Sequence, residues 1–448
     1  MVAIDWRAVE DEAIDLFRAL LRVDTSNPPG NERPAAELLA ELFRREGLDP
    51  TVIESQPTRA NVVARLRGDG TGGGPLLLAA HLDVVPADAS RWSAPPFGAE
   101  LRDGWIWGRG AIDMKNMAAM SAMTLVLLAR AGRRRRRDVI FAGVADEEAG
   151  CTHGSRFLVD HHADLVRAEY ALGELGGFPL YMPRKTFYLV QVAEKGICWV
   201  RARVRGTPGH GSIPREDNCV ARLGEALGRL GRARMPYHPV PVVSDFVYRM
   251  ATGQPAAAGA LLRQVLNPAL APIVLRLVPD RSIARTLDAQ LRNTASPTVL
   301  RAGGKTNVIP GAAEAEIDGR TLPGQSTADF LRELRAVLGD EVELEVIKES
   351  TATVTEPIES PVMRAIRDAL AAVEPHAEVL PNMIPGYTDA NSWSRLGTRC
   401  YGFSPVRFPA DAGVRFADLY HGDDERIPVD GFRFGLRLLH DVVARVAG

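Results

Sequence analysis

Three consecutive carboxylates follow an apolar segment in the middle of the chain. Residues 139–150 read V-I-F-A-G-V-A-D-E-E-A-G, which is typical of a buried strand that ends at the rim of a sheet in Asp146, Glu147 and Glu148. Adjacent anions in a partly dry cleft repel one another and take up protons unless a cation compensates them. Taken alone, the stretch fits either a solvated acidic loop or a cation site.

Two more segments bring polar side chains to similar places. Residues 76–80, all Leu and Ala, lead into His81 and Asp83, whose side chains point the same way on an extended chain. The carboxylate can orient a metal-binding histidine, although a structural histidine at a strand end has the same pattern. Asp113 stands in G-R-G-A-I-D-M-K where a dinucleotide-binding loop needs glycine, and its charge would oppose a pyrophosphate. We therefore interpret Asp113 as a residue that holds a cation.

Glu174 and His421 extend this set of candidates. Glu174 ends the apolar segment 171–173, and His421 lies in L-Y-H-G-D-D-E-R-I. A set of His, Asp and Glu without cysteine favours zinc or a related divalent metal at a hydrolytic site over a structural zinc site. Five candidate ligands that share one carboxylate indicate two metals about 3.5–4 Å apart.

Together the motifs resemble one enzyme family. H-L-D-V-V-P, G-R-G-A-I-D-M-K, D-E-E, G-E, G-T-P-G-H-G-S and H-G-D-D-E-R-I follow its order and spacing over nearly the whole chain. The family is that of the di-zinc amidohydrolases, which includes aminoacylases, acetylornithine deacetylase, succinyl-diaminopimelate desuccinylase and carboxypeptidase G. The resemblance implies a homodimer with two zinc ions, replaceable by cobalt or manganese, that cleaves an N-acyl amino acid or small peptide with a free carboxylate.

The resemblance also implies the metal ligands. Asp113 would bridge both metals, with His81 and Glu174 completing one site and Glu148 and His421 the other. Glu174, where aspartate is the other choice, favours deacylation or carboxypeptidase-type cleavage, and deacylation is the expected reaction. A dipeptidase or carboxypeptidase of the same family is the alternative, and a catalytically inactive binding protein on this scaffold is a further one.

Roles for residues around the metals follow from the same resemblance. Asp83 would lie behind the ligands, and Glu147 would be the general base, which agrees with the divergence of neighbouring side chains on an extended segment. His210, in a turn-rich segment that alone indicates a surface loop, would reach across a dimer interface and polarise the scissile carbonyl. Asn307 and Arg320 resemble lid residues that contact the substrate.

Arg320 follows an alternating segment that ends in Gly319, so its guanidinium is expected at a strand end. The planar fork of donors suits the substrate's carboxylate. Gly386 begins G-Y-T-D-A, which resembles the active-site loop before the last metal ligand.

Strands and helices alternate along the first part of the chain and again near its end, which predicts an α/β sandwich with parallel strands. From about residue 195 the order becomes β-α-β-β-α-β, the ferredoxin-like pattern. We expect a discontinuous catalytic α/β/α sandwich, residues 1–194 and 352–448, with an inserted ferredoxin-like α+β lid and dimerisation domain, residues 195–351. A helical insertion is expected within that domain at about 236–296.

Composition narrows the possible partners. The 448 residues carry a formal net charge of -2, which gives no reason to expect nucleic acid or a membrane, and the arginine run 133–137 has no wider basic face around it. No apolar stretch is long enough to span a bilayer. The start lacks a basic segment followed by an apolar one, and the four cysteines are scattered, so we expect a cytoplasmic protein.

Overall fold

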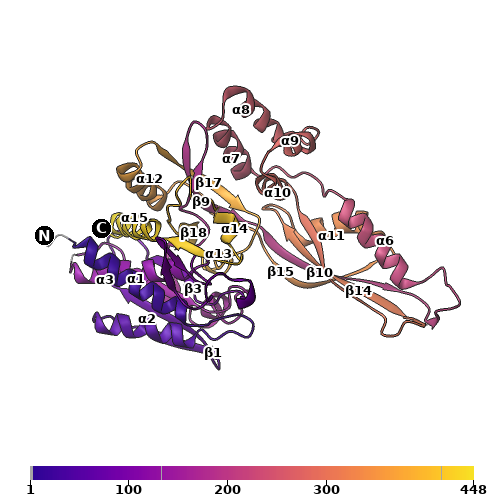
Figure 1. The fold of residues 1–448 in the computed structure, drawn as a ribbon, viewed down its shortest axis with the longest axis horizontal. Helices are drawn as coiled ribbons and strands as arrows, with labels where there is room; N and C mark the ends of the chain where they lie inside the picture. Colours follow the sequence, from indigo (N-terminus) through magenta and orange to yellow (C-terminus); the bar gives the residue numbers. More distant parts are fainter. Residues whose placement is uncertain (1–3, 133, 415) are drawn as a thin grey trace. The chain divides into compact units, whose positions relative to one another are not determined.

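The computed structural model describes residues 4–132, 134–414 and 416–448, and the chain forms two compact units (Figure 1). The first unit comprises the chain up to Val192 together with Thr355–Pro381 and Thr388–Gly448. The second comprises Ala193–Val354 and the short segment Asn382–Tyr387. Gly386, expected in the second part of the catalytic domain, therefore groups with the inserted unit.

The first unit is built on a mixed sheet whose central strands are parallel. Along the sheet the order is β1 (Thr51–Gln56), β2 (Arg59–Leu66), β6 (Val139–Val144), β3 (Leu76–His81), β7 (Tyr170–Gly173), β18 (Arg399–Gly402) and β9 (Thr186–Glu194). The pairs β6–β3, β3–β7 and β7–β18 are parallel, whereas β1, β2 and β9 run antiparallel to their neighbours. The carboxyl ends of β3, β6 and β7 therefore meet at one edge, where α/β sheets place their ligands.

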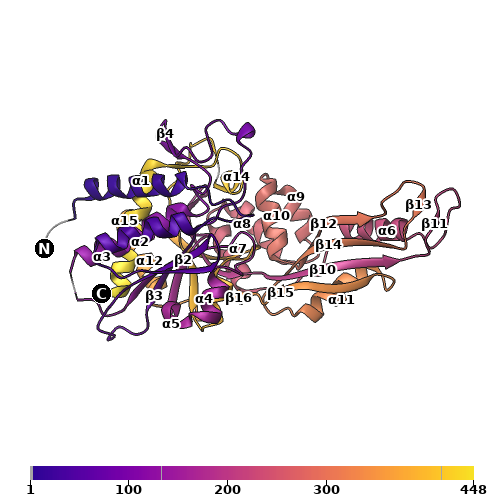
Figure 2. The same cartoon turned by 90° about the horizontal axis from the view of Figure 1, so that it is seen from below.

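Helices cover both faces of this sheet, as predicted for an α/β/α sandwich (Figure 2). The helices α1 (Trp6–Arg22), α2 (Arg33–Arg45), α3 (Lys115–Arg130), α12 (Pro361–Val373) and α15 (Val429–Ala447) form one layer. The other layer contains α4 (Ser155–His161), α5 (Ala163–Val166) and α13 (Ala390–Ser394), packed on alternate residues of β3 and β6. Every residue of α3 from Lys115 to Leu128 is buried, which agrees with its largely apolar composition.

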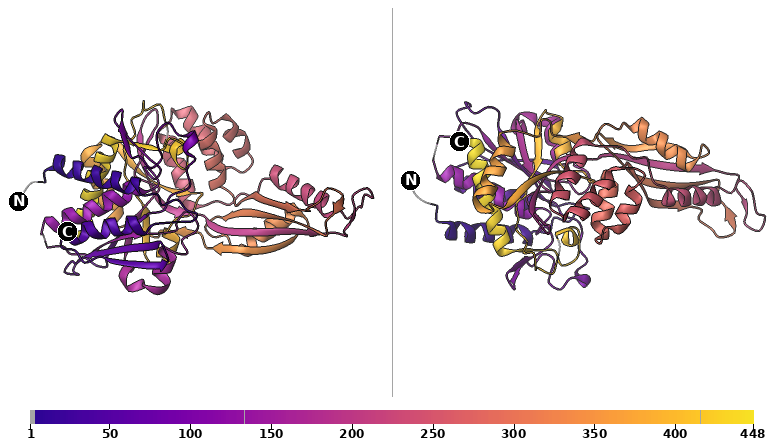
Figure 3. Two further views of the ribbon diagram at one scale, coloured as in Figure 1. Left: turned by 60° about the horizontal axis from the view of Figure 1, so that its bottom comes forward. Right: turned by 90° about the horizontal axis from the view of Figure 1, so that it is seen from above.

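The second unit has the predicted ferredoxin-like order (Figure 3). Its antiparallel sheet runs β12 (Thr294–Ala302), β14 (Ala312–Thr321), β10 (Gly196–Arg205) and β15 (Glu343–Ser350). The helices α6 (Cys219–Arg232) and α11 (Thr327–Leu338) cover one face, on a core made by alternate strand residues. The opposite face is charged, and arginines of β10 pair there with glutamates of β14 and β15.

A helical insertion separates α6 from β12. It contains α7 (Pro241–Thr252), α8 (Ala256–Arg263), the 3-10 turn η2 (Gln264–Leu266), α9 (Ala271–Leu277) and α10 (Arg281–Gln290). The helices end before the predicted limit of 296, because β12 already begins at Thr294 and pairs there with β14.

Short elements complete the two units. The small sheet β4 (Glu100–Arg102), β5 (Trp105–Trp107) and β19 (Arg426–Pro428) belongs to the first unit, as do η1 (Ala89–Arg91), β8 (Pro179–Tyr181) and α14 (Phe416–Leu419). The strand β17 (Ala377–Ile384) pairs with β9. The second unit also holds β16 (Thr353–Val354) and the pair β11 (Gly209–His210) and β13 (Val308–Ile309).

Two arginines of the run 133–137 form ion pairs with neighbouring loops. Arg134 pairs with Asp69, and Arg137 pairs with Glu169, so these cations bind neighbouring loops; Arg133 lies outside the described residues.

In the described chain, every helix is too short or too polar to cross a bilayer.

Candidate metal centre and active site

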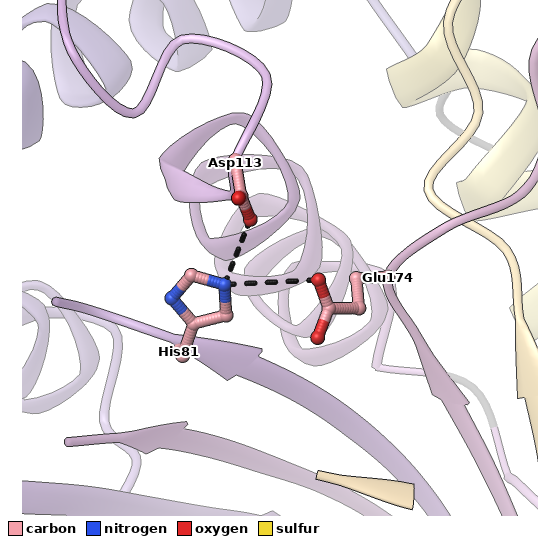
Figure 4. A group of neighbouring side chains, drawn as sticks. All are labelled: His81, Asp113 and Glu174. Atoms are coloured by element: carbon pink, nitrogen blue, oxygen red, sulfur yellow. Dashed lines mark hydrogen bonds and ion pairs between the residues drawn. The ribbon is translucent and has the colours of Figure 1, made fainter. Parts of the chain in front are cut away.

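Three of the predicted ligands meet at the carboxyl edge of the central strands (Figure 4). His81 ends β3, and Glu174 follows β7, the strand beside it. The Nε2 atom of His81 lies 2.9 Å from Asp113 Oδ1 and 3.8 Å from Glu174 Oε2. Its Nδ1 atom lies 2.9 Å from the main-chain oxygen of Asp83, so the Nε2 atom is directed towards the two carboxylates.

A second group of ligands shares Asp113 with the first. His421 Nε2 lies 2.8 Å from Asp113 Oδ2 and 3.2 Å from Glu148 Oε2. One ligand atom from each of these three residues lies within 4.8 Å of the others, and the same holds for the first group. The two oxygens of Asp113 thus serve two adjacent groups, which is the arrangement that two neighbouring metals require.

The unpaired oxygens of this cluster suit a cation. Asp113 Oδ2, Glu148 Oε1 and Glu174 Oε1 are buried and have no hydrogen-bond partner. Asp113 Oδ2 is without one although His421 Nε2 is 2.8 Å away, so the two atoms lie side by side rather than bonded in line. Buried carboxylates without partners are costly, and a divalent cation in each of the two groups would satisfy them.

The cluster carries an excess of negative charge in the metal-free protein. Burial raises the pKa of Glu147 well above its ordinary value, and the charge of Glu174 adds to this effect. Burial and the charge of Asp113 raise the pKa of Glu148 to about 7. For His421, burial acts in the opposite direction, but the adjacent carboxylates of Asp113 and Glu148 raise its pKa to about 10. Protons thus supply the positive charge that a metal would bring.

Asp83 holds the segment that carries Glu147 and Glu148. Its Oδ1 accepts the main-chain N–H of Glu147, and its Oδ2 accepts that of Glu148, both at 3.1 Å. The Nδ2 atom of Asn27 donates to Asp83 Oδ2 at 2.9 Å and to Asp146 Oδ1 at 3.1 Å. Asp83 is fully buried, and its contacts are those of a positioning group behind the ligands.

A buried arginine supports the same segment from behind. Arg59 Nη2 donates to Asp146 Oδ1 at 2.9 Å, and its Nε and Nη2 atoms bind both oxygens of the fully buried Glu32 at 2.7 and 2.8 Å. Gly30 has φ +83°, and a Cβ atom there would come within 2.2 Å of the Arg59 guanidinium. Sequence reasoning missed Arg59, since nothing in its neighbourhood along the chain signals a buried ion pair.

Glu425 holds the loop that carries Asp113. Its buried carboxylate accepts the main-chain N–H groups of Gly110, Ile112 and Asp113 at 3.0, 2.6 and 3.1 Å. It also pairs with Arg109 Nη1 at 2.6 Å, while Arg109 Nη2 donates to the oxygen of Gly422 at 3.0 Å. Glu425 therefore joins the loop of Asp113 to the loop of His421. The motif H-G-D-D-E-R-I contains Glu425, but sequence reasoning singled out only its histidine.

The remaining candidates belong to the second unit. His210 is exposed on β11, its Nδ1 lies 2.7 Å from Ser212 Oγ, and the oxygen of Asn307 accepts the N–H of Gly211 at 2.9 Å. Within this unit the structure thus brings His210 and Asn307 together.

Arg320 lies on β14, and both oxygens of Asp318 bind it, at 2.7 Å from Nε and 3.2 Å from Nη2. A substrate carboxylate at Arg320 would therefore have to use the remaining N–H groups or displace Asp318.

Comparisons with known proteins agree with this geometry. A family model described as "Peptidase family M20/M25/M40" matches residues 77–445. The N-fatty-acyl-amino acid synthase/hydrolase PM20D1 of Bos taurus is 29% identical over 413 residues, covering 88% of this chain and 80% of the relative. Aminoacylase-1 of Sus scrofa is 26% identical over 461 residues, covering 100% of this chain and 98% of the relative. The M20 family metallo-carboxypeptidase Sso-CP2 of Sulfolobus solfataricus has the same fold, with a TM-score of 0.71 and 16% identity over 97% of this chain and 99% of that one.

Proposed function

The chain belongs to the peptidase family M20/M25/M40, and on that premise we propose that it hydrolyses N-acyl amino acids whose carboxylate is free. It is a metal-dependent hydrolase acting on amide bonds. The names of two relatives support the substrate, since one is called an N-fatty-acyl-amino acid synthase/hydrolase and the other an aminoacylase. The observation that carries the proposal is the sharing of Asp113 between two adjacent ligand groups.

The donor set fits two divalent metals, and we propose zinc, with cobalt or manganese as substitutes. His81, Asp113 and Glu174 would hold one ion, and Asp113, Glu148 and His421 the other. A bound metal pair supplies a polarised carbonyl and an acidified water. The chain's own residues would do the rest of the chemistry.

We assign the proton transfers to Glu147. Asp83 fixes its main chain by accepting its N–H. Its carboxylate lies close enough to His81 and Glu148 for one atom of each to lie within 4.8 Å of the others. Glu147 would take a proton from the attacking water and return it to the leaving amine. Asp83 and Glu425 would keep the two carboxylate-bearing loops in place.

The second unit supplies the proposed contacts to the acyl and carboxylate groups. His210 would polarise the scissile carbonyl in the partner subunit of a homodimer, and Asn307, Arg320 and Gly386 would contact the substrate. Support for pairing comes from β12, an edge strand of the second unit's four-stranded sheet, on which Leu300 is 64% exposed. Arg320 would share its guanidinium between Asp318 and the substrate. We place the protein in the cytoplasm, where four free cysteines stay reduced.

Two measurements on purified protein test the proposal. We expect about two metal equivalents after reconstitution with zinc, and a panel of N-acetyl, N-succinyl, N-fatty-acyl and dipeptide substrates should be cleaved best among the acylated amino acids. Preference for dipeptides would identify a dipeptidase or carboxypeptidase of the family instead. Full metal content without hydrolysis of any of them would point to a binding protein.

A further inference from the structure

Exposed apolar side chains are concentrated on the helical insertion. Among the described residues, 16 large hydrophobic side chains are exposed, and six of them belong to residues 241–290. These six are Tyr248, Leu261, Leu270, Ile273, Leu277 and Ile283. Single exposed apolar residues are ordinary, but a cluster on one small segment marks an interaction surface.

Three of the six form a stripe along α9. Ile273 and Leu277 are 58% and 59% exposed, and Leu270, just before the helix, is 38% exposed. Positions i, i+3 and i+7 lie on the same side of a helix, whereas the buried residues Ala271 and Leu275 lie on another. The core of the insertion is thus already filled by other residues of α9, and the stripe faces outwards.

Arginine is the prevailing charged residue of the same helical segment. Residues 241–290 contain five arginines and three aspartates but no lysine or glutamate, while the whole chain has a net charge of -2. Arg276, Arg281 and Arg285 line a groove of about 410 Å³ between α9 and α10, together with Arg234. Among the residues that the structure describes, none of these four arginines has a carboxylate partner, and Asp288 in the same groove is bound by Arg292 at 2.9 Å.

We propose that α9 and α10 dock on an anionic lipid surface. The stripe of Leu270, Ile273 and Leu277 would enter the interface between head groups and acyl chains, as the apolar face of an interfacial helix does. The neighbouring guanidiniums would bind lipid phosphates, for which their planar fork is better suited than a lysine ammonium. The charge of this segment is complementary to such a surface, although the chain as a whole is slightly acidic. The proposal does not depend on the substrate proposed above.

Vesicle binding tests the inference on the full-length, metal-loaded protein. Co-sedimentation would compare vesicles of phosphatidylcholine alone with vesicles that also contain phosphatidylglycerol, at low and at high salt. We expect binding to the anionic vesicles only, weakened by salt. Charge reversal in R276E/R281E/R285E and polar replacement in L270S/I273S/L277S should each weaken binding at least tenfold, with the thermal midpoint of unfolding near that of the wild type.

A matched variant on another helix provides the control. Val220 on α6 is 42% exposed and Arg222, two residues later, is partly exposed, so V220S/R222E removes the same kinds of group elsewhere in the unit. This variant should bind vesicles like the wild type. Equal loss in the control, equal binding to both vesicle types, or no effect of the two triple variants would overturn the proposal. Dissociation of an oligomer by L270S/I273S/L277S, without vesicle binding by the wild type, would assign the stripe to contacts between copies of the chain.

Discussion

At the scale of single residues, the cluster depends on carboxylates in two kinds of role. Asp113, Glu148 and Glu174 each have a buried oxygen without a hydrogen-bond partner. The oxygens of Asp83 and Glu425 instead accept hydrogen bonds from main-chain N–H groups. These bonds fix the loops that carry Asp113 and Glu148. Substitutions in the cluster should therefore change the reaction rate or the metal content, whereas substitutions of the carboxylates that hold the loops should lower the free energy of unfolding.

Glu147→Gln should remove the general base and leave the metals in place. We expect kcat to fall by about 10² to 10⁴, the usual contribution of a positioned acid–base group. Metal content measured by elemental analysis should stay at the wild-type level. Glu148→Gln is the neighbouring comparison and should lower metal content. The opposite result for the two variants would exchange their roles.

Glu425→Ala should destabilise the first unit. It leaves the buried Arg109 without its partner and three main-chain N–H groups without acceptors. Breaking a buried pair in this way typically costs about 3–5 kcal/mol of the free energy of unfolding. Urea denaturation would measure it, and the metal affinity of the variant should also fall.

The exposed pair of Arg445 and Asp441 is the control for this prediction. Asp441→Ala should cost about 0–1 kcal/mol, as exposed pairs do. Similar losses in the two variants would show that Glu425 is no more than an ordinary ion-pair partner.

At the scale of elements, the parallel strands explain why much of the site was predictable. His81 is the last residue of β3 and Glu174 follows the adjacent parallel strand β7, so an apolar segment ending in a polar residue marked each of them as a candidate. Arg59 and Glu425 gave no such signal, because their partners are distant in sequence and burial alone makes them important. The partner of Arg320 was two residues away on the same strand, yet an alternating pattern does not show which side chains bind each other.

Lys195, the residue between β9 and β10, is buried and has a shifted pKa. Burial lowers the pKa of Lys195 to about 7, and the charge of Arg320 acts in the same direction. Between pH 7 and 10.5 the unfolded chain keeps this proton while the folded chain has released it, so the wild type gains stability as pH rises.

Lys195→Met lacks this dependence. It should therefore be more stable than the wild type at pH 7, and the difference should narrow towards pH 10. Chemical denaturation at several pH values would measure the free energy of unfolding of both proteins. Lys305→Met, at an exposed position, should show no such trend. A difference between Lys195→Met and the wild type that stays constant over this range would mean that Lys195 does not titrate there.

At the scale of the whole molecule, the proposed dimer can be tested through activity. Mixing inactive His210→Ala with inactive Glu147→Gln should restore activity if subunits exchange and His210 serves the partner's site. One of the two sites in each heterodimer would then have both residues, so up to about half of the wild-type rate is expected in heterodimers. Exchange should be shown independently with differently tagged chains. Complete exchange without recovered activity would place His210 within its own chain's reaction or outside it.

The position of β18 has a consequence for how the protein is made. This strand fills the sheet between β7 and β9, and His421 and Glu425 come later still in the chain. A ribosome that has delivered β7, β9 and the whole second unit has therefore produced a sheet with a missing central strand and an incomplete set of ligands. Domains generally fold as they emerge, so the second unit can form early, whereas the first cannot close. The second group of ligands is thus complete only after His421 has been synthesised, so a chain that stops before it would lack one of the two proposed metal sites.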